Sequence, residues 1–492
     1  MANVTSQPKT HAAPARRWFA WALIASVALL AGFQARALVA STSAASSHEP
    51  DDPPPKDDAE PTAADKPRKA ADSPEGDDDA EAEGEDEPTL YADQPVGPPV
   101  RIDQVPAAAT NAAAAKELTP AGIDLWRHAK LVDGRYTAKL ADGRTAGLSV
   151  DAKLQRTLQN LLNNYKPMAG AVVALDPKTG QILAMAEYAK DGNATDLATR
   201  PLYPAASVFK IITGAALLEA GVSPDAETCY HGGMHGLVGK LLQDAPRVDR
   251  RCLSLSMALA KSANVVFGKL AVRHLDSDSL RKEAEKFLFN RPIWTQKGVE
   301  QSTAQIADSS TDKLEFAKSA AGFGRVRLSP MHAALIAASV ANGGVAVEPT
   351  LLHDIDGGTL PAPASKRLLN PDTARRLRDM MKLTVSEGTA RHSFRDRRRW
   401  VLGDIEVGGK TGSLADKRPY KDYSWFVGFA PADNPTIAVA VVIVNSTLWR
   451  IKAPYVAREA LRAYLIGGNV GDPPVAAARY HKRKRAKKPA RR

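Results

Sequence analysis

Four serines in this sequence are followed by a lysine three positions later, a spacing that could pair a nucleophile with a base. On a helix the two side chains share a face, so the amine can reach the hydroxyl and take its proton. Three of the pairs lie in polar or charged stretches, where an exposed lysine keeps a high pKa; they are Ser6/Lys9, Ser279/Lys282 and Ser310/Lys313. Only Ser207 and Lys210 begin an apolar stretch, residues 207–221, which predicts a buried helix. Because a helix N-terminus stabilises negative charge and desolvation lowers a lysine pKa, Ser207 is the candidate nucleophile and Lys210 the candidate base.

Two other short motifs could complete such a site. S-A-N occurs once, with Ser262 and Asn264 between two expected helices. K-T-G occurs twice: residues 178–180 fall in an expected turn, which explains them fully, whereas K-T-G-S at 410–413 follows two glycines and precedes expected strands. Glycines at such a place let a substrate backbone approach closely. Taken singly, each motif is more often structural than catalytic.

The hydrophobic pattern predicts the elements that would hold these motifs. A helix that Ser149 or Asp151 can cap carries four leucines on one face, at positions 154, 158, 161 and 162. Short apolar runs at 170–175 and 181–185 flank a turn and predict a β-hairpin. Helical patterns follow at 253–261, 265–274, 278–287, 330–341 and 371–386, and strands return at 425–429 and 436–444. An early hairpin, a helical middle and late strands predict an α+β fold, with one sheet assembled from both ends of the domain.

Charge is unevenly distributed along the 492 residues. Residues 18–35 carry no charge and follow Arg16 and Arg17, which predicts either a retained membrane helix over 18–37 or a signal peptide cleaved at A-R-A 35–37. Both interpretations leave residues 1–17 in the cytoplasm and export the rest of the chain. The expected location is therefore the inner membrane, with a single span and the folded part in the periplasm.

The exported part is strongly charged near both of its ends. Residues 49–87 hold 17 acidic against 4 basic residues, and 49–99 is expected to be an extended, disordered tether. The last fourteen residues hold nine basic residues and no acid, and 475–492 is expected to be a disordered tail. Outside a membrane this tail would meet anionic lipid or wall polymer, so nucleic acid is not an expected partner.

Only the part between these charged ends can bury a sizeable core. A short pre-domain segment is expected at 100–147 and a domain at 148–466. The hydrophobic content of 44% excludes a wholly disordered chain.

Cys229 and Cys252 are the only cysteines in the chain. In an exported protein a disulfide is the leading interpretation, and closing a loop of about 24 residues would stabilise the fold by about 3 kcal/mol. Two alternatives remain open. The cysteines together with His231 and His235 could supply four zinc ligands, or both thiols could be free.

The order of the three motifs is more informative than any one of them. S-V-F-K at 207, S-A-N at 262 and K-T-G-S at 410 resemble the signature motifs of penicillin-binding proteins and serine β-lactamases. Their surroundings resemble the transpeptidase domain of monofunctional, class B-like penicillin-binding proteins, in segments 170–186, 200–210, 258–271, 329–344, 387–390 and 425–431. The resemblance implies a β-lactamase/transpeptidase-like fold over 148–466, with a central antiparallel sheet flanked by helices and an all-helical subdomain. It implies neither a metal nor a cofactor.

The resemblance also implies a role for each motif residue. Ser207 would attack the carbonyl between two terminal D-alanines of a peptidoglycan stem peptide, with Lys210 as its base. Ser262 would relay a proton to the departing amine, and Asn264 would hold Lys210 and the peptide amide. The substrate carboxylate would bind the K-T-G-S strand, which Lys410 keeps electropositive and which continues with Thr411, Gly412 and Ser413. Backbone N–H groups of Ser207 and Ser413 would form the oxyanion hole, and β-lactams would acylate Ser207 and stay.

Other functions remain open at this stage. A carboxypeptidase would use water in place of an acceptor amine. A β-lactamase needs a device that hydrolyses its acyl intermediate, such as the Glu of an E-x-x-L-N segment; residues 285–290 come near this pattern but space the Asn one residue too far. A non-catalytic β-lactam sensor or wall-binding scaffold need not keep the motif set, which is complete here. Because only about 50 residues separate the tether from 148, neither a glycosyltransferase domain nor a large pedestal is expected before the domain.

Overall fold

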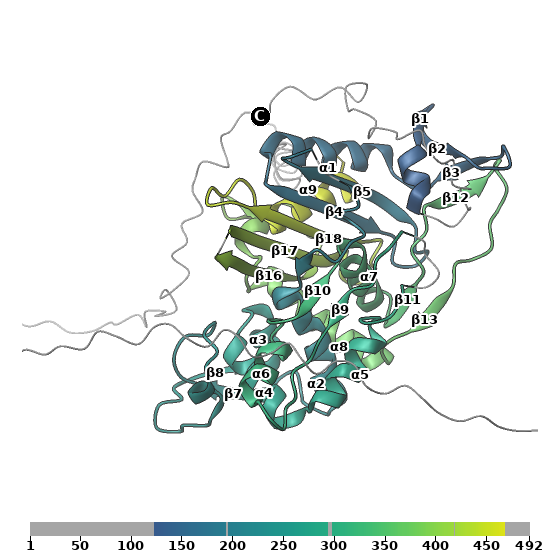
Figure 1. Cartoon of the computed structure of the whole chain (residues 1–492). Coiled ribbons are helices and arrows are strands. Elements are labelled where there is room, and N and C mark those ends of the chain that lie inside the picture. The colour runs from purple at the N-terminus through teal and green to yellow at the C-terminus, as the bar shows by residue number, and fades with distance from the viewer. Residues whose placement is uncertain (1–122, 193–194, 294–297, 418, 468–492) are drawn as a thin grey trace, which may run out of the picture. The chain divides into compact units, whose positions relative to one another are not determined.

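A five-stranded antiparallel sheet forms the centre of the computed structural model, which describes residues 123–192, 195–293, 298–417 and 419–467 (Figure 1). Its strands run in the order β16-β17-β18-β4-β5, so a hairpin from the beginning of the domain pairs with three strands from its end. The strands are β4 Ala169–Leu175, β5 Ile182–Ala189, β16 Gly408–Lys417, β17 Tyr420–Ala430 and β18 Ile437–Asn445. The prediction of one sheet assembled from both ends of the domain is confirmed.

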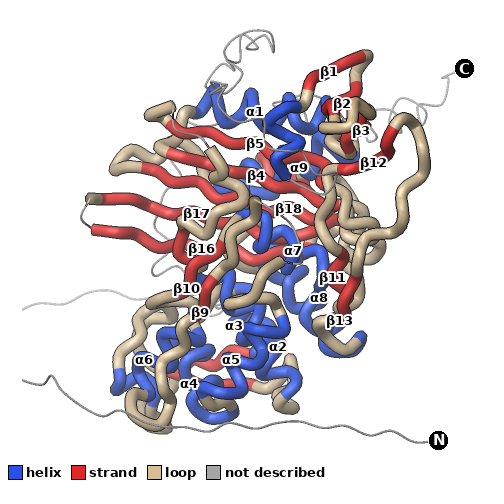
Figure 2. The backbone as a smooth tube through the Cα atoms, turned by 45° about the vertical axis from the view of Figure 1, so that its right-hand side comes forward, coloured by secondary structure: helices blue, strands red, loops and turns tan. Residues whose placement is uncertain are grey.

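Helices cover both faces of this sheet (Figure 2). They are α1 Ala152–Tyr165 and α9 Ala453–Leu465 on one face, and α7 Pro330–Ala341 on the other, where α8 Pro371–Ser386 packs against α7 and the edge strand β16. Strands β4 and β18 are accordingly apolar at consecutive positions rather than at alternate ones, apart from Asn445 at the end of β18. In β18, Val439 and Val441 pack with α1 and α9, while Ala440 and Val442 pack with α7.

The expected helical insertion follows β5 and precedes β16 in the sequence, and in space it gathers below the sheet (Figure 2). Its helices are α2 Lys210–Glu219, α3 Leu255–Ala260, α4 Asn264–His274, α5 Ser277–Lys286 and α6 Lys313–Ala320. Helix α2 packs against α3, α4, α5 and α8, and its residues from Lys210 to Leu218 are all buried. This burial on all sides explains why its sequence is apolar on nearly every side.

Several local features differ from the sequence-based expectation. The helix expected from 207 begins instead as a 3-10 turn, η4 Ala206–Phe209, and becomes α-helical only at Lys210. The reason is that only two residues separate the end of β6 (Tyr203–Pro204) from the nucleophile, so the chain must turn sharply, with Ala206 at a φ of 47°. K-T-G-S lies within edge strand β16 itself. Helices α6 and α9 were not predicted, although Asp312 caps α6 and a proline opens α9.

Residues 123–148 fold onto the domain as part of the same body. Their elements are η3 Ile123–His128, β1 Lys130–Val132, β2 Arg135–Lys139 and β3 Thr145–Leu148. These strands form a four-stranded sheet with β12 (Leu352–Ile355), in the order β1-β2-β3-β12. Leu125 and Leu140 are buried in the same core as α7 and the central sheet. The domain boundary expected at 148 therefore lies inside the folded body.

The remaining short elements complete the described part of the chain. They are β7 Glu227–Tyr230, η5 Gly239–Leu242, β8 Arg251–Ser254, β9 Thr303–Ala304, β10 Val326–Leu328, β11 Val345–Val347, β13 Ser365–Arg367, η6 His392–Phe394, β14 Arg395–Asp396 and β15 Arg399–Trp400. Among the described residues, no helix is both long and apolar enough to cross a membrane. The expected cytoplasmic segment 1–17, span 18–37, tether 49–99 and tail 475–492 lie outside the described residues.

Candidate active site

Ser207 lies on the 3-10 turn η4, which is fastened to the central sheet. Trp425 of β17 is buried and donates its Nε1–H to the Pro204 carbonyl at 2.9 Å, just before the turn. Ser207 retains 7% of its surface, whereas Lys210, at the first residue of α2, has none exposed. The nucleophile is thus slightly exposed to solvent, whereas the Lys210 amine beside it is fully buried.

The Lys210 amine makes three hydrogen bonds at the start of α2. Its Nζ donates to Ser207 Oγ at 2.8 Å, to Asn264 Oδ1 at 2.6 Å and to the Ala321 carbonyl at 3.1 Å. Burial, followed by the nearby charge of Lys410, lowers the pKa of Lys210 well below the ordinary value of a lysine. Once the ammonium loses its proton, the Ser207 hydroxyl can donate to the amine. This is the arrangement of a nucleophile and its base.

The segment after α6 packs tightly on the nucleophile turn. Gly322 has a φ of +89°, and a Cβ there would lie 1.9 Å from the Ala206 carbonyl oxygen. Thr213 of α2 donates its hydroxyl to the Ala320 carbonyl at 2.6 Å. These contacts hold the Ala321 carbonyl against the Lys210 amine, and only glycine fits at 322.

Replacing Gly322 with alanine should destabilise the fold by about 3 kcal/mol or more, because a backbone clash adds to the cost of the positive φ. Gly221 is the matched control, since its φ is +86° but no atom lies within 4 Å of its Cβ position. Gly221→Ala should cost only about 1–2 kcal/mol. Urea unfolding followed by circular dichroism measures both losses. Equal losses would contradict the importance of the contact with Ala206.

The S-A-N motif connects α3 to α4 and contacts both buried lysines of the site. Ser262 has a φ of 57°, and its hydroxyl accepts a hydrogen bond from Lys410 Nζ at 2.9 Å. Asn264 is the first residue of α4, where its Oδ1 accepts from Lys210. Its Nδ2 donates to the His235 carbonyl at 2.7 Å. The motif therefore bridges the two amines.

Lys410 places the second buried amine on the edge strand β16. Besides Ser262, its Nζ contacts the Thr411 carbonyl at 2.8 Å. Burial lowers the pKa of Lys410 to about 7, so its charge is sensitive to pH near neutrality. Because β16 has a partner strand on one side only, alternate backbone N–H and C=O groups point away from β17 and remain available to a ligand.

The K-T-G-S strand runs directly beside the nucleophile turn. A Cβ on Gly412 would lie 3.2 Å from Cγ2 of Val208 and 3.4 Å from its backbone nitrogen, so a larger side chain would push the strand away. The next residue, Ser413, is exposed and lies opposite Ser424 of β17. The structure thus brings the end of this motif close to Ser207.

Thr389 is a site residue that the sequence analysis did not single out. Its hydroxyl is hydrogen bonded to the hydroxyl of Thr411, and its backbone N–H donates to the Ala260 carbonyl at 3.1 Å. A Cβ on the preceding Gly388 would lie 2.3 Å from that same carbonyl oxygen. The E-G-T-A segment at 387–390 was the available signal, but its spacing by itself indicates no chemistry.

The other short-motif matches that fall among the described residues have structural partners elsewhere. Ser279 belongs to the capping box of α5 with Asp276. Ser310 donates its hydroxyl to Asp308 at 2.8 Å, and Lys178 donates to Asn434 at 2.9 Å. None of these residues joins the cluster around Ser207.

The segment that resembles a β-lactamase motif is also used structurally. Glu285 pairs with Arg291 at 2.6 Å, and the Asn290 side chain exchanges two hydrogen bonds with the backbone of Ala304. Phe289 between them packs edge to face on Phe209 of the nucleophile turn. The segment therefore packs on the nucleophile turn through Phe289, and the Glu285 carboxylate lies in an exposed ion pair.

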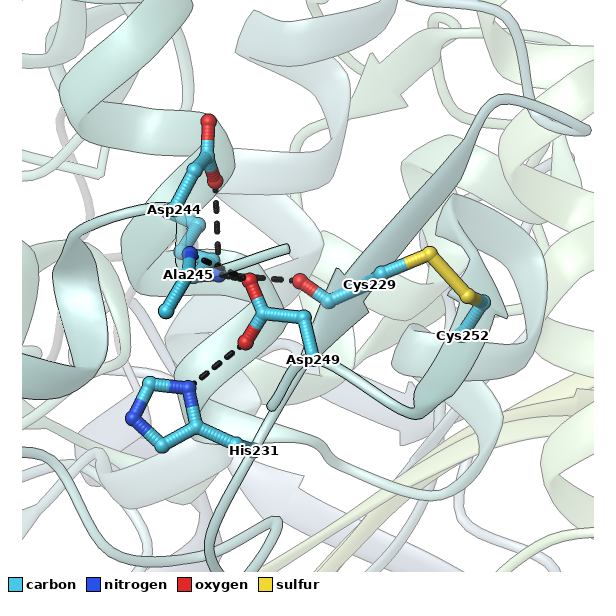
Figure 3. Close-up of a disulfide and its surroundings, with 7 residues drawn as sticks. Cys229, His231, Asp244, Ala245, Asp249 and Cys252 are labelled. Atoms are coloured by element: carbon cyan, nitrogen blue, oxygen red, sulfur yellow. Dashed lines mark hydrogen bonds and ion pairs between the residues drawn. A yellow bond between two sulfur atoms is a disulfide. The ribbon is translucent and has the colours of Figure 1, made fainter. Parts of the chain in front are cut away.

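The two cysteines form a disulfide that joins β7 to β8 (Figure 3). Both thiols that the zinc alternative requires are therefore used, and His231 bonds Asp249 at 2.6 Å instead. Within the described ranges, no group of three or more His, Cys, Asp or Glu side chains is placed to hold a metal ion.

The fold and these contacts define the class of the protein. A serine hydroxyl bonded to a buried amine of lowered pKa, with a second buried amine and an edge strand beside it, is the arrangement of a serine-type acyl-transfer enzyme.

Comparison with known proteins identifies the family within that class. The family model described as the penicillin binding protein transpeptidase domain matches residues 170–463, and the chain belongs to this family. Peptidoglycan D,D-transpeptidase PbpA of Mycobacterium tuberculosis is 28% identical over 355 residues, which cover 63% of this chain and 69% of that protein. Peptidoglycan D,D-transpeptidase MrdA of Haemophilus influenzae is 26% identical over 395 residues, which cover 70% of this chain and 59% of that protein.

Solved structures show the same likeness. Penicillin-binding protein A from Mycobacterium tuberculosis, solved as an imipenem acyl-enzyme complex, matches with a TM-score of 0.55 and 26% identity over 66% of this chain and 80% of that one. Pseudomonas aeruginosa PBP2, in complex with WCK 5153, matches with a TM-score of 0.54 and 25% identity over 68% and 82%. The expected transpeptidase fold, with an antiparallel sheet flanked by helices, and the class B-like resemblance are confirmed.

Proposed function

We propose that this protein is a peptidoglycan D,D-transpeptidase that cross-links stem peptides through an acyl-enzyme on Ser207. The pair of buried amines carries the proposal, because Lys210 bonds Ser207 and Asn264 while Lys410 bonds Ser262. Family membership and the activities named for the relatives support the same reaction.

In the acylation half of the reaction, Ser207 Oγ bonds to the carbonyl carbon of the penultimate D-alanine. Its proton passes to the neutral Lys210 amine. The carbonyl oxygen takes the electron pair and accepts hydrogen bonds from the backbone N–H groups of Ser207 and Ser413, each worth about 3–4 kcal/mol. As the peptide C–N bond breaks, the departing D-alanine nitrogen takes a proton through Ser262, which the Lys410 amine contacts. An ester on Ser207 remains.

In the second half, the amine of another stem peptide attacks the ester carbonyl. The amine loses a proton to Lys210, a new amide forms, and Ser207 leaves with a proton. Each cross-link formed therefore releases one D-alanine. A β-lactam follows only the first half, because its ring opens without releasing a leaving group and blocks the acceptor.

The K-T-G-S strand binds the terminal carboxylate of the donor peptide. Lys410 supplies positive charge, and the hydroxyls of Thr411 and Ser413 supply hydrogen bonds. Thr389 orients the Thr411 hydroxyl through their mutual hydrogen bond. Gly412 keeps the strand close enough to Val208 for the carboxylate and the reacting carbonyl to be held together.

A donor stem peptide ending in D-Ala-D-Ala, mixed with an acceptor stem peptide that carries a free side-chain amine, tests the proposal by mass spectrometry. A cross-linked dimer with one D-alanine released per bond supports transpeptidation. Release of D-alanine with no dimer would assign a carboxypeptidase instead. Rapid turnover of a β-lactam would assign a β-lactamase, against which the outward position of Glu285 argues.

Acylation by a β-lactam should rise and then fall with pH. Lys210 must be neutral to take the proton, so the second-order rate constant rises through its pKa, which burial holds well below that of a free lysine. Lys410 must be charged to attract the ligand carboxylate, so the rate falls as pH passes about 7. Stopped-flow quenching across the pH range measures this profile. A rate that climbs steadily to about pH 10, as for an ordinary lysine base, would contradict both assignments.

We further propose that residues 18–37 anchor the protein in the inner membrane, with the enzyme in the periplasm at the end of tether 49–99. The basic tail at 475–492 then meets anionic lipid or wall polymer by charge attraction. The mass of protein extracted from membranes separates a retained anchor from cleavage at 35–37. Binding of the tail-deleted protein to anionic vesicles, compared with the full chain, tests the tail.

A further inference from the structure

A long loop, residues 231–250, projects between β7 and β8 and is closed at its base by the disulfide (Figure 3). Cys229 and Cys252 lie opposite each other in the antiparallel ladder, so the bond clamps the two strands where the loop leaves them. The mechanism above assigns no part to this loop or to its cysteines.

The loop caps the helix that begins with Asn264. Helix α4 has Ala263 at its N-cap and therefore no side-chain cap for its first backbone N–H groups. The loop supplies one missing acceptor, because the Met234 carbonyl accepts from Val265 N–H at 3.2 Å. Beside it, the His235 carbonyl accepts from the side-chain Nδ2 of Asn264 at 2.7 Å. The start of α4 is thus completed by backbone carbonyls of the loop.

The His235 contact determines which way the Asn264 amide faces. Its Oδ1 faces the Lys210 amine at 2.6 Å, so turning the amide over loses this hydrogen bond, and the bond from Nδ2 to His235 adds a second loss. With Nδ2 bonded to His235, a flipped amide would place an N–H against the lysine donor and an oxygen against a carbonyl. Both contacts would be repulsive.

A buried lysine on the same helix holds the loop in place. The side chain of Lys269 has no exposed surface, and its Nζ donates to the Cys229 carbonyl at 2.9 Å and to Asp249 at 3.0 Å. Asp249 also accepts from Ala245 N–H at 2.9 Å and is bonded to His231 at 2.6 Å (Figure 3). The Lys269 ammonium therefore connects α4 both to β7, which carries Cys229, and to the end of the loop, which carries Asp249.

Apolar and charged contacts extend this attachment along α4. A Cβ on Gly268 would lie 2.9 Å from both Leu237 and Leu242 of the loop, which shows how closely the loop is seated. Farther along, Arg273 pairs with Asp244 at 2.9 Å. The loop thus touches α4 from its first turn to its last.

We propose that the disulfide-closed loop 231–250 is a positioning element of the acylation site, which fixes the Asn264 amide through the His235 carbonyl. Asp249 and the Cys229–Cys252 bond are positioning residues, since they touch neither substrate nor Lys210. The inference rests on the proposed function, because Asn264 matters only if Lys210 is the base.

Two loop variants test this inference: Cys229→Ser/Cys252→Ser, and Asp249→Asn. The second removes the nearer of the two carboxylates paired with Lys269, at 3.0 Å, and leaves Asp244 at 3.3 Å. The matched control is Asp276→Ala, which removes the N-cap of α5 and so weakens the fold without touching the loop. Acylation of the full chain by a fluorescent penicillin is followed to completion at several pH values. The loop variants should label stoichiometrically but about 10- to 100-fold more slowly, as expected for a catalytic contact displaced by about 1 Å. The control should keep the wild-type rate.

The pH profile separates positioning from a general loss of structure. Asn264 Oδ1 stabilises the charged form of Lys210, whose other neighbours are Ser207, the Ala321 carbonyl and the charge of Lys410, none of them in the loop. Loosening the loop should therefore lower the pKa of Lys210 and move the acid limb of the profile to lower pH. Wild-type rates and an unshifted profile in either folded loop variant would overturn the inference. A wild-type protein that gives no Ser207-dependent label would overturn the proposed function instead.

Discussion

Ser207→Ala is expected to abolish covalent binding of β-lactams. The wild-type chain should gain the mass of one β-lactam, because the Ser207 hydroxyl is bonded to the buried Lys210 amine and its turn lies beside the edge strand β16. The variant has no atom that can form the ester, and the cavity left by one oxygen is too small to disturb the fold. Removing a catalytic serine typically costs about a million-fold in rate, which leaves no adduct on the time scale of hours.

The sequence itself offers the control for this experiment. Ser279 has the same spacing to a lysine, but its hydroxyl serves the capping box of α5. Ser279→Ala should gain the β-lactam mass at the wild-type rate. An adduct that persists in Ser207→Ala, measured by intact mass spectrometry and located by peptide mapping, would refute the assignment of the nucleophile.

Lys210→Met should slow acylation by about 10²- to 10⁴-fold while leaving the protein folded. Methionine fills a similar volume with apolar atoms, which suits a position with no exposed surface. The variant loses the base but leaves Asn264 Oδ1 and the Ala321 carbonyl without their donor, so a stability loss of about 1–3 kcal/mol is also expected.

The pH profile makes the second prediction specific. In Lys210→Met the rise of acylation with pH should disappear, because no group remains whose deprotonation activates Ser207. Lys282→Met, at an exposed lysine with the same spacing to a serine, should retain both the rate and the profile. A Lys210→Met rate within a few-fold of the wild type would mean that another group takes the serine proton.

Most elements could be predicted from the sequence because their signals are local. Asp151 caps α1 by accepting from Leu154 N–H, and the leucines expected on one face of that helix are buried. The uniform apolar character of α2 and β18 likewise reflects burial on all sides. The start of α2 was predicted less well, since the 3-10 turn that carries Ser207 is set by the pairing of β6 with β10.

Contacts in the candidate site could be predicted from the sequence only where both residues belong to one short motif. Ser207 and Lys210 are one helical turn apart, so their contact follows from local structure. The contacts that join Lys210 to Asn264 and Lys410 to Ser262 span 54 and 148 positions. Resemblance to a family, not spacing, suggested the first contact, and the second was not predicted. Thr389 and Gly322 escaped notice because their roles depend entirely on what packs against them.

The sequence alone determined the kinds of chemical group and the local elements that carry them: a serine with a lysine on one helix, and a K-T-G-S segment next to strands. Tertiary structure decided which backbone carbonyls meet the buried donors: Ala321 accepts from the Lys210 amine, and His235 accepts from the Asn264 amide. A backbone carbonyl is the same in every residue, so its position leaves no trace in the residue type. The cysteines illustrate the same point. The sequence shows that there are two of them, but the loop that their disulfide closes is placed beside Asn264 by the tertiary contact of Asp249 with Lys269 of α4.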